Sequence, residues 1–171
     1  EGLSAAQAHI AQNGHSIELR ICAEDATQDF RPAIGDILLL DEPRGEGVRV
    51  DSGILDGGKV TTDFDPMLSK LIVHGRNRAE AIARAREAVQ NYVILGVTTN
   101  TGYLDTILAH PDFASGDVST GFLAEQADTL TAPGEDVSDL LMAAAALSDE
   151  RLVSDVMQIP EMHRKMGGWR N

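Results

Sequence analysis

The spacing of the apolar residues changes near residue 77, and this change constrains the fold more than any other feature of the chain. Before it, short runs alternate apolar and polar residues, as half-buried strands do. After it, apolar residues recur every three to four positions, as on one face of a helix. Strands that come first and helices that come after favour an α+β fold, with a mostly antiparallel sheet followed by packed helices.

The clearest strand is predicted over residues 15–23, where Ile17, Leu19 and Ile21 alternate with polar residues. Further strands are predicted over 37–40, 48–54, 59–62 and 68–74. Asp56-Gly57-Gly58 suits a tight turn, so the second and third of these are predicted to pair as a hairpin.

The first helix is predicted to begin after Asn77, which is a favoured N-cap residue, with Glu80 three positions later. Its apolar positions continue to Tyr92, and Gly96 is expected to end it. A second helix is predicted over 102–109, capped within 98–101 and stopped by Pro111, and a third begins near Thr120 and turns Phe122 and Leu123 inward.

Arg49 is the residue to which the sequence most strongly assigns chemistry. It follows Gly45 and Gly47, which allow a turn, and it alternates with Val48 and Val50 on a predicted strand. An arginine held on a strand suits a carboxylate, a phosphate or a developing oxyanion, because its planar fork stays charged. The alternative on spacing alone is an ordinary solvated surface arginine.

The charge balance excludes some classes of partner. Fourteen basic residues against 27 acidic ones give a net charge of −13, which argues against a nucleic-acid or anionic-membrane surface. A single cysteine, Cys22, excludes an internal disulfide and a cysteine-rich zinc site. We expect a cytoplasmic protein. No metal site is predicted, because the acidic residues between 51 and 65 lack calcium-loop spacing and instead indicate a solvated face.

Composition also suggests a boundary near residue 130. Ala132-Pro133-Gly134 breaks the preceding pattern and is typical of a linker. We therefore expect one domain over 1–130 and a linker with the start of a further region over 131–171. The chain begins with Glu1 rather than Met, so we expect a piece of a longer polypeptide.

Six segments carry a resemblance to a known family. They are Gly14 to Asp25, Phe30 to Gly35, Gly47 to Arg49, Phe64 to Leu71, Gly96 to Asn100 and Thr120 to Leu123. In this order they resemble the C-terminal domain of biotin carboxylases, with Phe64 in place of the family's tyrosine. The resemblance is closest to the α subunits of acyl-CoA carboxylases. Residues 49–54 are similar to propionyl-CoA carboxylases, whereas 167–171 are more like 3-methylcrotonyl-CoA carboxylases.

The resemblance implies ATP-dependent carboxylation of biotin by bicarbonate, with biotin, ATP and Mg²⁺ as cofactors. It implies that Arg49 is the catalytic residue and that it binds the ureido oxygen of biotin. The implied partners are bicarbonate, a biotin carrier domain, a carboxyltransferase β subunit that the 131–171 region begins to contact, and a second copy of the intact subunit. Residues that bind ATP and metal precede this segment in the family, so the isolated chain is expected to be inactive.

Two other interpretations remain open. The segment could be a non-catalytic assembly or dimerisation module, or the same domain of a pyruvate carboxylase or urea carboxylase. Arg49 with its flanking glycines favours the catalytic interpretation, because a scaffold has no need of an arginine there.

Lys70 is expected to form a structural salt bridge.

Overall fold

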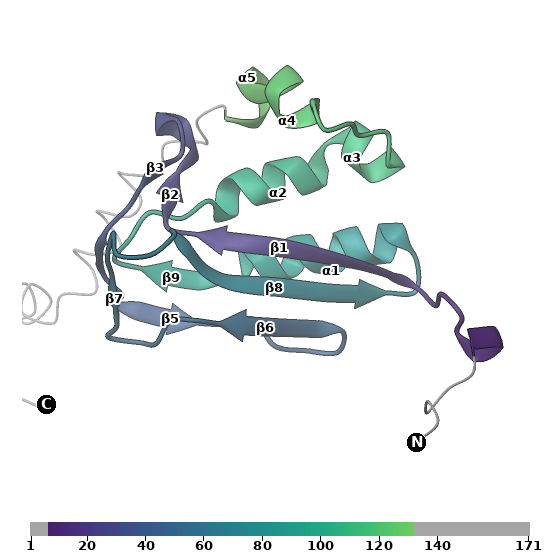
Figure 1. Cartoon of the computed structure of the whole chain (residues 1–171), viewed down its shortest axis with the longest axis horizontal. Helices are drawn as coiled ribbons and strands as arrows, with labels where there is room; N and C mark the ends of the chain where they lie inside the picture. Colours follow the sequence, from purple (N-terminus) through teal and green to yellow (C-terminus); the bar gives the residue numbers. More distant parts are fainter. Residues whose placement is uncertain (1–6, 132–171) are drawn as a thin grey trace, which may run out of the picture. The chain divides into compact units, whose positions relative to one another are not determined.

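A computed structural model describes residues 7–131 of the chain. The strands are β1 (His15–Cys22), β2 (Glu24–Asp25), β3 (Arg31–Pro32), β4 (Gly35–Asp36), β5 (Leu39–Asp41), β6 (Val48–Ser52), β7 (Lys59–Val60), β8 (Met67–Gly75) and β9 (Val93–Leu95). The helices are α1 (Arg78–Gln90), α2 (Thr101–Ala109), α3 (Pro111–Ser115), α4 (Phe122–Glu125) and α5 (Ala127–Leu130), with 3₁₀ turns at Gln7–His9 and Ala26–Gln28. The strands precede most of the helices, as the change in spacing predicts (Figure 1).

The central sheet is antiparallel and has the strand order β1-β8-β6. Its alternating residues divide it into two faces, since successive side chains of a strand point to opposite sides. Ile17, Leu19 and Ile21 of β1 lie on the buried face, together with Leu71 and Val73 of β8. Their polar neighbours lie on the other face, which is open to solvent.

Helix α1 covers the buried face of this sheet (Figure 1). Asn77 caps it as predicted, because its side chain accepts a hydrogen bond from the Glu80 amide at 2.9 Å. Ala81 and Ala85 are fully buried, and these small side chains let the helix pack closely on the strands. Helix α2 packs beside α1, and its Leu108 is buried in the hydrophobic core.

The predicted hairpin between 48–54 and 59–62 is wrong. The turn itself forms, since the Gly58 amide donates to the Leu55 carbonyl at 2.9 Å, but β7 then pairs with β4. Strand β6 pairs instead with β8. The reason is burial: the nine-residue β8 lets Val48 and Val50 pack against the core, which a two-residue partner could not do.

The predicted end of the first helix at Gly96 is also wrong, because α1 stops at Gln90. The next residues form β9, which pairs with β5. Two of them, Val93 and Ile94, are β-branched and favour a strand. Tyr92 is buried, and its hydroxyl forms a 2.8 Å hydrogen bond with Ser69 of β8, which fixes the chain where it leaves the helix.

Three smaller differences concern short segments. Of the strand predicted over 37–40, only Leu39 and Leu40 form a strand, as part of β5, whereas the buried Ile37 lies between β4 and β5. Pro111 does not simply stop a helix but begins α3, a favoured place for proline. Phe122 is buried as predicted, whereas Leu123 is 48% exposed, so its predicted inward direction is wrong. Leu140, Leu141 and the four alanines that follow soon after also predict a short helix over 138–147, which lies outside the described residues.

Within the described residues, no helix is long and apolar enough to cross a membrane. The predicted boundary at residue 130 stays a prediction, because residues 132–171 lie outside the described part of the chain.

Candidate functional site

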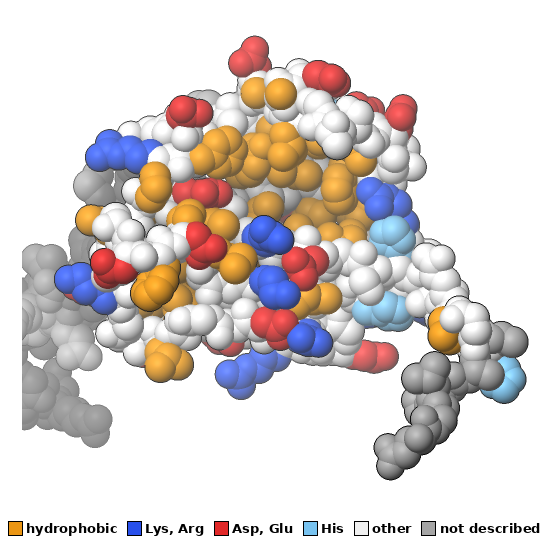
Figure 2. Space-filling model, in the orientation of Figure 1, with side chains coloured by type: hydrophobic (Ala, Val, Ile, Leu, Met, Phe, Trp, Pro, Cys, Tyr) orange, Lys and Arg blue, Asp and Glu red, His pale blue; other side chains and the backbone are white. Residues whose placement is uncertain are grey.

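Five charged side chains share the solvent-exposed face of the central sheet, which we call the charged face. They are Glu18 and Arg20 on β1, Lys70 on β8, and Arg49 and Asp51 on β6. The strand register brings them together. Arg20, Lys70 and Asp51 are cross-strand neighbours in one row, and Glu18 and Arg49 lie on either side of Ile72 in the next. Basic and acidic side chains alternate over these strands in Figure 2.

The charges form a continuous chain of opposite pairs. Arg20 Nε lies 4.0 Å from Glu18, whose other oxygen lies 3.3 Å from Lys70 Nζ, and this ammonium lies 4.0 Å from Asp51. Asp51 ends the chain by pairing with Arg49 at 2.7 Å. The predicted salt bridge of Lys70 is therefore present. Three cations against two carboxylates leave the charged face with one net positive charge and an arginine at each end.

Arg49 lies where the alternation predicts, on the strand face opposite Val48 and Val50. Its Nε and Nη2 each donate to one oxygen of Asp51 at 2.7 Å. This bidentate pair raises the pKa of Arg49 and lowers that of Asp51, because each charge stabilises the other. The side chain remains 72% exposed, so its remaining N–H groups face solvent. Asp51 orients the guanidinium and also offsets its charge.

Arg20 is a second candidate that the sequence interpretation passed over. Its side chain is 73% exposed, and its ion-pair partner is Glu18 at 4.0 Å, beyond hydrogen-bonding distance. The alternation of β1 already indicates that Arg20 points away from the core. The missing information was the register with β8, which places Arg20 directly beside Lys70.

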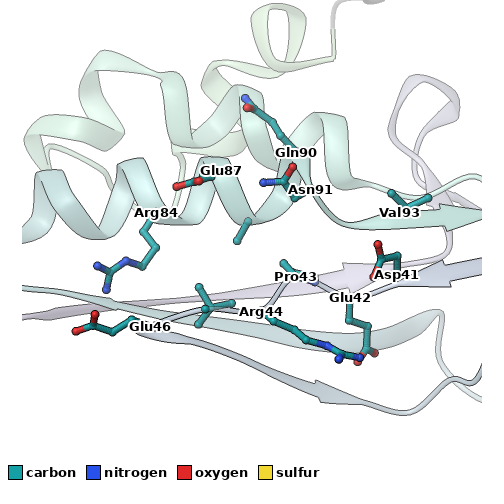
Figure 3. Close-up of a pocket in the computed structure, with 13 residues that line it drawn as sticks. Asp41, Glu42, Pro43, Arg44, Glu46, Arg84, Glu87, Gln90, Asn91 and Val93 are labelled. Atoms are coloured by element: carbon teal, nitrogen blue, oxygen red, sulfur yellow. The ribbon is translucent and has the colours of Figure 1, made fainter.

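A cavity of about 760 Å³ lies on the opposite side of β6, between the β5–β6 connection and α1 (Figure 3). Val48 lines it, whereas Arg49 points to the other face of the strand. Its charged lining residues are Asp41, Glu42, Arg44, Glu46, Arg84 and Glu87. One of these residues, Arg84, donates hydrogen bonds to the His74 carbonyl and to Glu80. Because the cavity and the charged face lie on opposite sides of β6, they are separate features.

The other acidic side chains and the thiol in residues 7–131 do not form a common metal-binding site. Asp56 accepts a hydrogen bond from the Leu40 amide, and Asp63 accepts one from the Thr61 hydroxyl. Within residues 7–131 no three His, Cys, Asp or Glu side chains are grouped as metal ligands. Burial, together with nearby Glu24, raises the pKa of the Cys22 thiol to about 11, so the thiol is protonated at neutral pH.

Comparison with known proteins defines the class to which this fold and charged face belong. The sequence model of the biotin carboxylase C-terminal domain matches residues 18–125, more than half of the chain. The chain therefore belongs to the biotin carboxylase C-terminal domain family, and its α+β fold is the fold of that family.

Individual relatives are whole carboxylase subunits. The mitochondrial propionyl-CoA carboxylase alpha chain of Homo sapiens is 45% identical over 121 residues, which cover 70% of this chain and 17% of that protein. The mitochondrial methylcrotonoyl-CoA carboxylase subunit alpha of Dictyostelium discoideum is 37% identical over 143 residues, covering 83% of this chain and 20% of that protein. The chain thus spans about a fifth of the length of these relatives.

Solved structures of biotin carboxylase domains have a fold similar to that of this chain. The biotin carboxylase domain dimer of Hydrogenobacter thermophilus 2-oxoglutarate carboxylase, in complex with MgADP, ADP and bicarbonate, is 36% identical with a TM-score of 0.75. The match covers 79% of this chain and 30% of that one. The biotin carboxylase subunit of a pyruvate carboxylase gives a TM-score of 0.75 at 35% identity, over 79% of this chain and 30% of that one.

Proposed function

We propose that this domain forms one wall of the active site in a larger carboxylase subunit, which carboxylates biotin with ATP and bicarbonate. The observation that carries the proposal is the charged face, with an exposed arginine at each end of its ion-pair chain. Membership of the biotin carboxylase family supplies the reaction class. Relatives with different acceptors match the chain, so the reaction with biotin is proposed ahead of any particular acceptor.

The charged face fits biotin chemically. Biotin supplies a ring nitrogen that accepts the carboxyl group, and the neighbouring ureido oxygen is a hydrogen-bond acceptor. An arginine on a rigid strand can donate N–H groups to that oxygen and stabilise negative charge there. By contrast, residues 7–131 gather no set of metal ligands, so we assign ATP and Mg²⁺ to the remainder of the subunit.

Two arginines compete for this role. Arg49, predicted from the sequence, is held firmly by Asp51, but this carboxylate lies 2.7 Å from its nitrogens and weakens the stabilisation of a second anion. Arg20 has a single, longer contact, and Glu18 in that contact is shared with Lys70. The electrostatics favour Arg20 as the donor to the ureido oxygen, with Arg49 as the residue tested against it.

The further partners are also proposals. Similarity to propionyl-CoA and methylcrotonoyl-CoA carboxylase alpha subunits supports an acyl-CoA carboxylase, with a biotin carrier domain and a carboxyltransferase β subunit as partners. The dimer of the Hydrogenobacter domain supports a homo-oligomer. A cytoplasmic location stays a prediction from composition.

The test is to replace each arginine by alanine in an intact subunit that carries this domain. Biotin carboxylation and ATP cleavage are measured side by side for Arg20→Ala, Arg49→Ala and a control, Arg76→Ala. Arg76 is 89% exposed and pairs with Glu80 of α1, away from the charged face. Loss of an oxyanion donor lowers kcat by about 10²- to 10³-fold.

We expect Arg20→Ala to show this loss with ATP binding intact, and Arg76→Ala to retain full activity. The same loss in Arg49→Ala alone would assign the role to Arg49, as the sequence predicts. Unchanged carboxylation in both variants would remove the charged face from the active site and contradict the proposal.

A further inference from the structure

Asn100 has an unusual set of partners for its position in the fold. It precedes the first residue of α2, where an asparagine side chain ordinarily caps the helix, yet it makes no capping hydrogen bond. It is instead 5% exposed and directed to the end of β1, 80 residues earlier in the chain. Figure 1 shows the start of α2 close to this end of β1.

The carboxamide of Asn100 acts on β1 as a neighbouring strand would. Its Oδ1 accepts from the Cys22 amide at 2.9 Å, and its Nδ2 donates to the Arg20 carbonyl at 3.1 Å. The Asn100 amide also donates to the Cys22 carbonyl at 3.1 Å. β1 is an edge strand of the central sheet, so these bonds satisfy backbone groups that have no strand partner on that side.

These bonds fall at an irregular point of the strand. The pairing of β1 with β8 shifts between Ile21 and Cys22, one residue after Arg20, because Leu68 of β8 has no partner on β1. This bulge on β8 interrupts the ladder that would otherwise hold the end of β1. The second hydrogen of Nδ2 goes to Glu24 Oε1 at 3.2 Å, so every polar group of the Asn100 side chain is used on this segment.

We infer that Asn100 is a positioning residue for Arg20: its carboxamide fixes the backbone of β1 at the bulge and thereby the direction of the Arg20 side chain on the charged face. This inference rests on the proposed role of Arg20 in biotin carboxylation. Asn100 itself is buried beside the edge of β1, and its side chain bonds to the Cys22 and Arg20 backbone and to Glu24 rather than to the Arg20 guanidinium.

The experiment is a double-mutant cycle in the intact subunit, with Arg20→Ala, Asn100→Ala and the combined variant. Asn100→Ala is expected to lower kcat for biotin carboxylation by about tenfold or more, because small displacements of a catalytic group are costly, while the KM for ATP stays unchanged. In the Arg20→Ala background the same change is expected to have no further effect on kcat, since no guanidinium remains to be positioned.

Ser69→Ala is the matched control. Ser69 is 3% exposed and its hydroxyl bonds to Tyr92 at 2.8 Å, so this variant also loses a buried hydrogen bond of the central sheet. It does not contact Arg20 through that bond and is expected to keep full kcat. An equal loss in Ser69→Ala, or an additive loss in the combined variant, would show that Asn100 acts through stability alone and would overturn the inference.

The outcomes separate this inference from the proposed function. If Arg20→Ala abolishes carboxylation while Asn100→Ala retains full kcat, the positioning role fails and the proposed function stands. If Arg20→Ala is fully active, the positioning role fails, and the proposed function stands only where Arg49→Ala loses carboxylation. Should Asn100→Ala not fold, Asn100→Asp takes its place in the cycle. It keeps the acceptor for the Cys22 amide but lacks the donor to Arg20, and full kcat in that variant would overturn the inference.

Discussion

The two arginines of the charged face differ in their ion-pair partners, and this difference affects how well each can bind an oxyanion. Arg49 donates twice to Asp51, so its position is fixed but its charge is offset. Arg20 lacks such a partner, and its backbone rather than its guanidinium is held, through Asn100. A guanidinium with a single long ion-pair contact on a fixed backbone suits an oxyanion that is present only during reaction, since no bidentate ion pair must be broken first.

The single cysteine permits a direct test of the burial at the end of β1. The pKa of the Cys22 thiol is raised from its ordinary value of 9.0 to about 11 by burial and then by Glu24. We expect alkylation of the folded chain by iodoacetamide, followed by mass spectrometry, to reach half its maximal rate near pH 11, against about pH 9 in urea.

The same shift has a consequence for stability. The pKa of Cys22 is higher in the folded chain than in the unfolded chain, so the neutral thiol stabilises the folded state relative to a thiolate. This contribution to the free energy of unfolding is fully present below pH 9 and is lost as the pH rises towards 11. A Cys22→Ser variant should lack this alkaline loss. Equal alkylation profiles in folded and unfolded chains would contradict the burial of the thiol.

The predictability of the charged face differs from residue to residue. Alternation alone assigns Arg49 and Arg20 to solvent-facing positions, and both assignments are correct. The pairing of Arg49 with Asp51 is also local, because residues two apart share a strand face. The partners of Lys70 could not be predicted individually, since they depend on which strands flank β8.

Helices α1 and α2 are joined by a bidentate ion pair. Arg86 Nε and Nη2 donate to the two oxygens of Asp105 at 2.8 and 3.2 Å, which lowers the pKa of this carboxyl. Asp105→Asn is expected to reduce the free energy of unfolding by about 0.5–1 kcal/mol at pH 7, because the pair is partly exposed to water. Urea denaturation of the 171-residue chain measures this difference.

The pH dependence provides the control. Since the pKa of Asp105 is lowered on folding, its stabilisation is present above the ordinary carboxyl range and is lost as the pH falls through the folded-state pKa. The difference between the two chains should therefore shrink at pH 3. Asp117→Asn, on the loop after α3, removes one carboxylate at another site, and a difference as large as that of Asp105→Asn would contradict the role of the ion pair.

Gly96 is a backbone requirement at the end of β9. Its φ is +106°, and a Cβ there would lie 2.0 Å from the Asp36 carbonyl oxygen. We expect Gly96→Ala to destabilise the chain by at least about 2 kcal/mol in urea, through the left-handed backbone and this backbone contact. Gly102→Ala is the control, because nothing lies within 4 Å of its Cβ position in α2 and alanine favours a helix. Equal stability of Gly96→Ala and the unmodified chain would contradict the strain.

The errors in the predicted elements share one physical cause. The turn at Gly57 and the N-cap at Asn77 depend on neighbours within four residues, and both form as predicted. The partner of β6 and the end of α1 depend on contacts with β8 and β5, which are distant in sequence. Local chemistry therefore fixes where the chain turns, whereas burial across the whole sheet fixes what it pairs with.

At the scale of the molecule, the order of strands before helices was enough to predict the α+β class, and the ordered motifs were enough to predict the family. Neither could predict the small sheets β4-β7 and β5-β9, which tie the chain together around the central sheet. Two- and three-residue strands carry too little alternation to be recognised. The pairing of these short strands therefore depends on which backbone groups the longer strands leave without hydrogen-bond partners.

The isolated 171-residue chain is expected to be inactive as a biotin carboxylase. Arg20 and Arg49 are 73% and 72% exposed, and in a medium of high dielectric constant an arginine stabilises a developing oxyanion only weakly. Catalysis by such donors requires a site from which water is excluded, which we assign to the remainder of the subunit. We expect no bicarbonate-dependent ATP cleavage when the chain is incubated with free biotin, ATP, Mg²⁺ and bicarbonate. An intact subunit assayed in parallel is the positive control, and turnover by the isolated chain above the protein-free rate would contradict the assignment of this domain to a single wall of the active site.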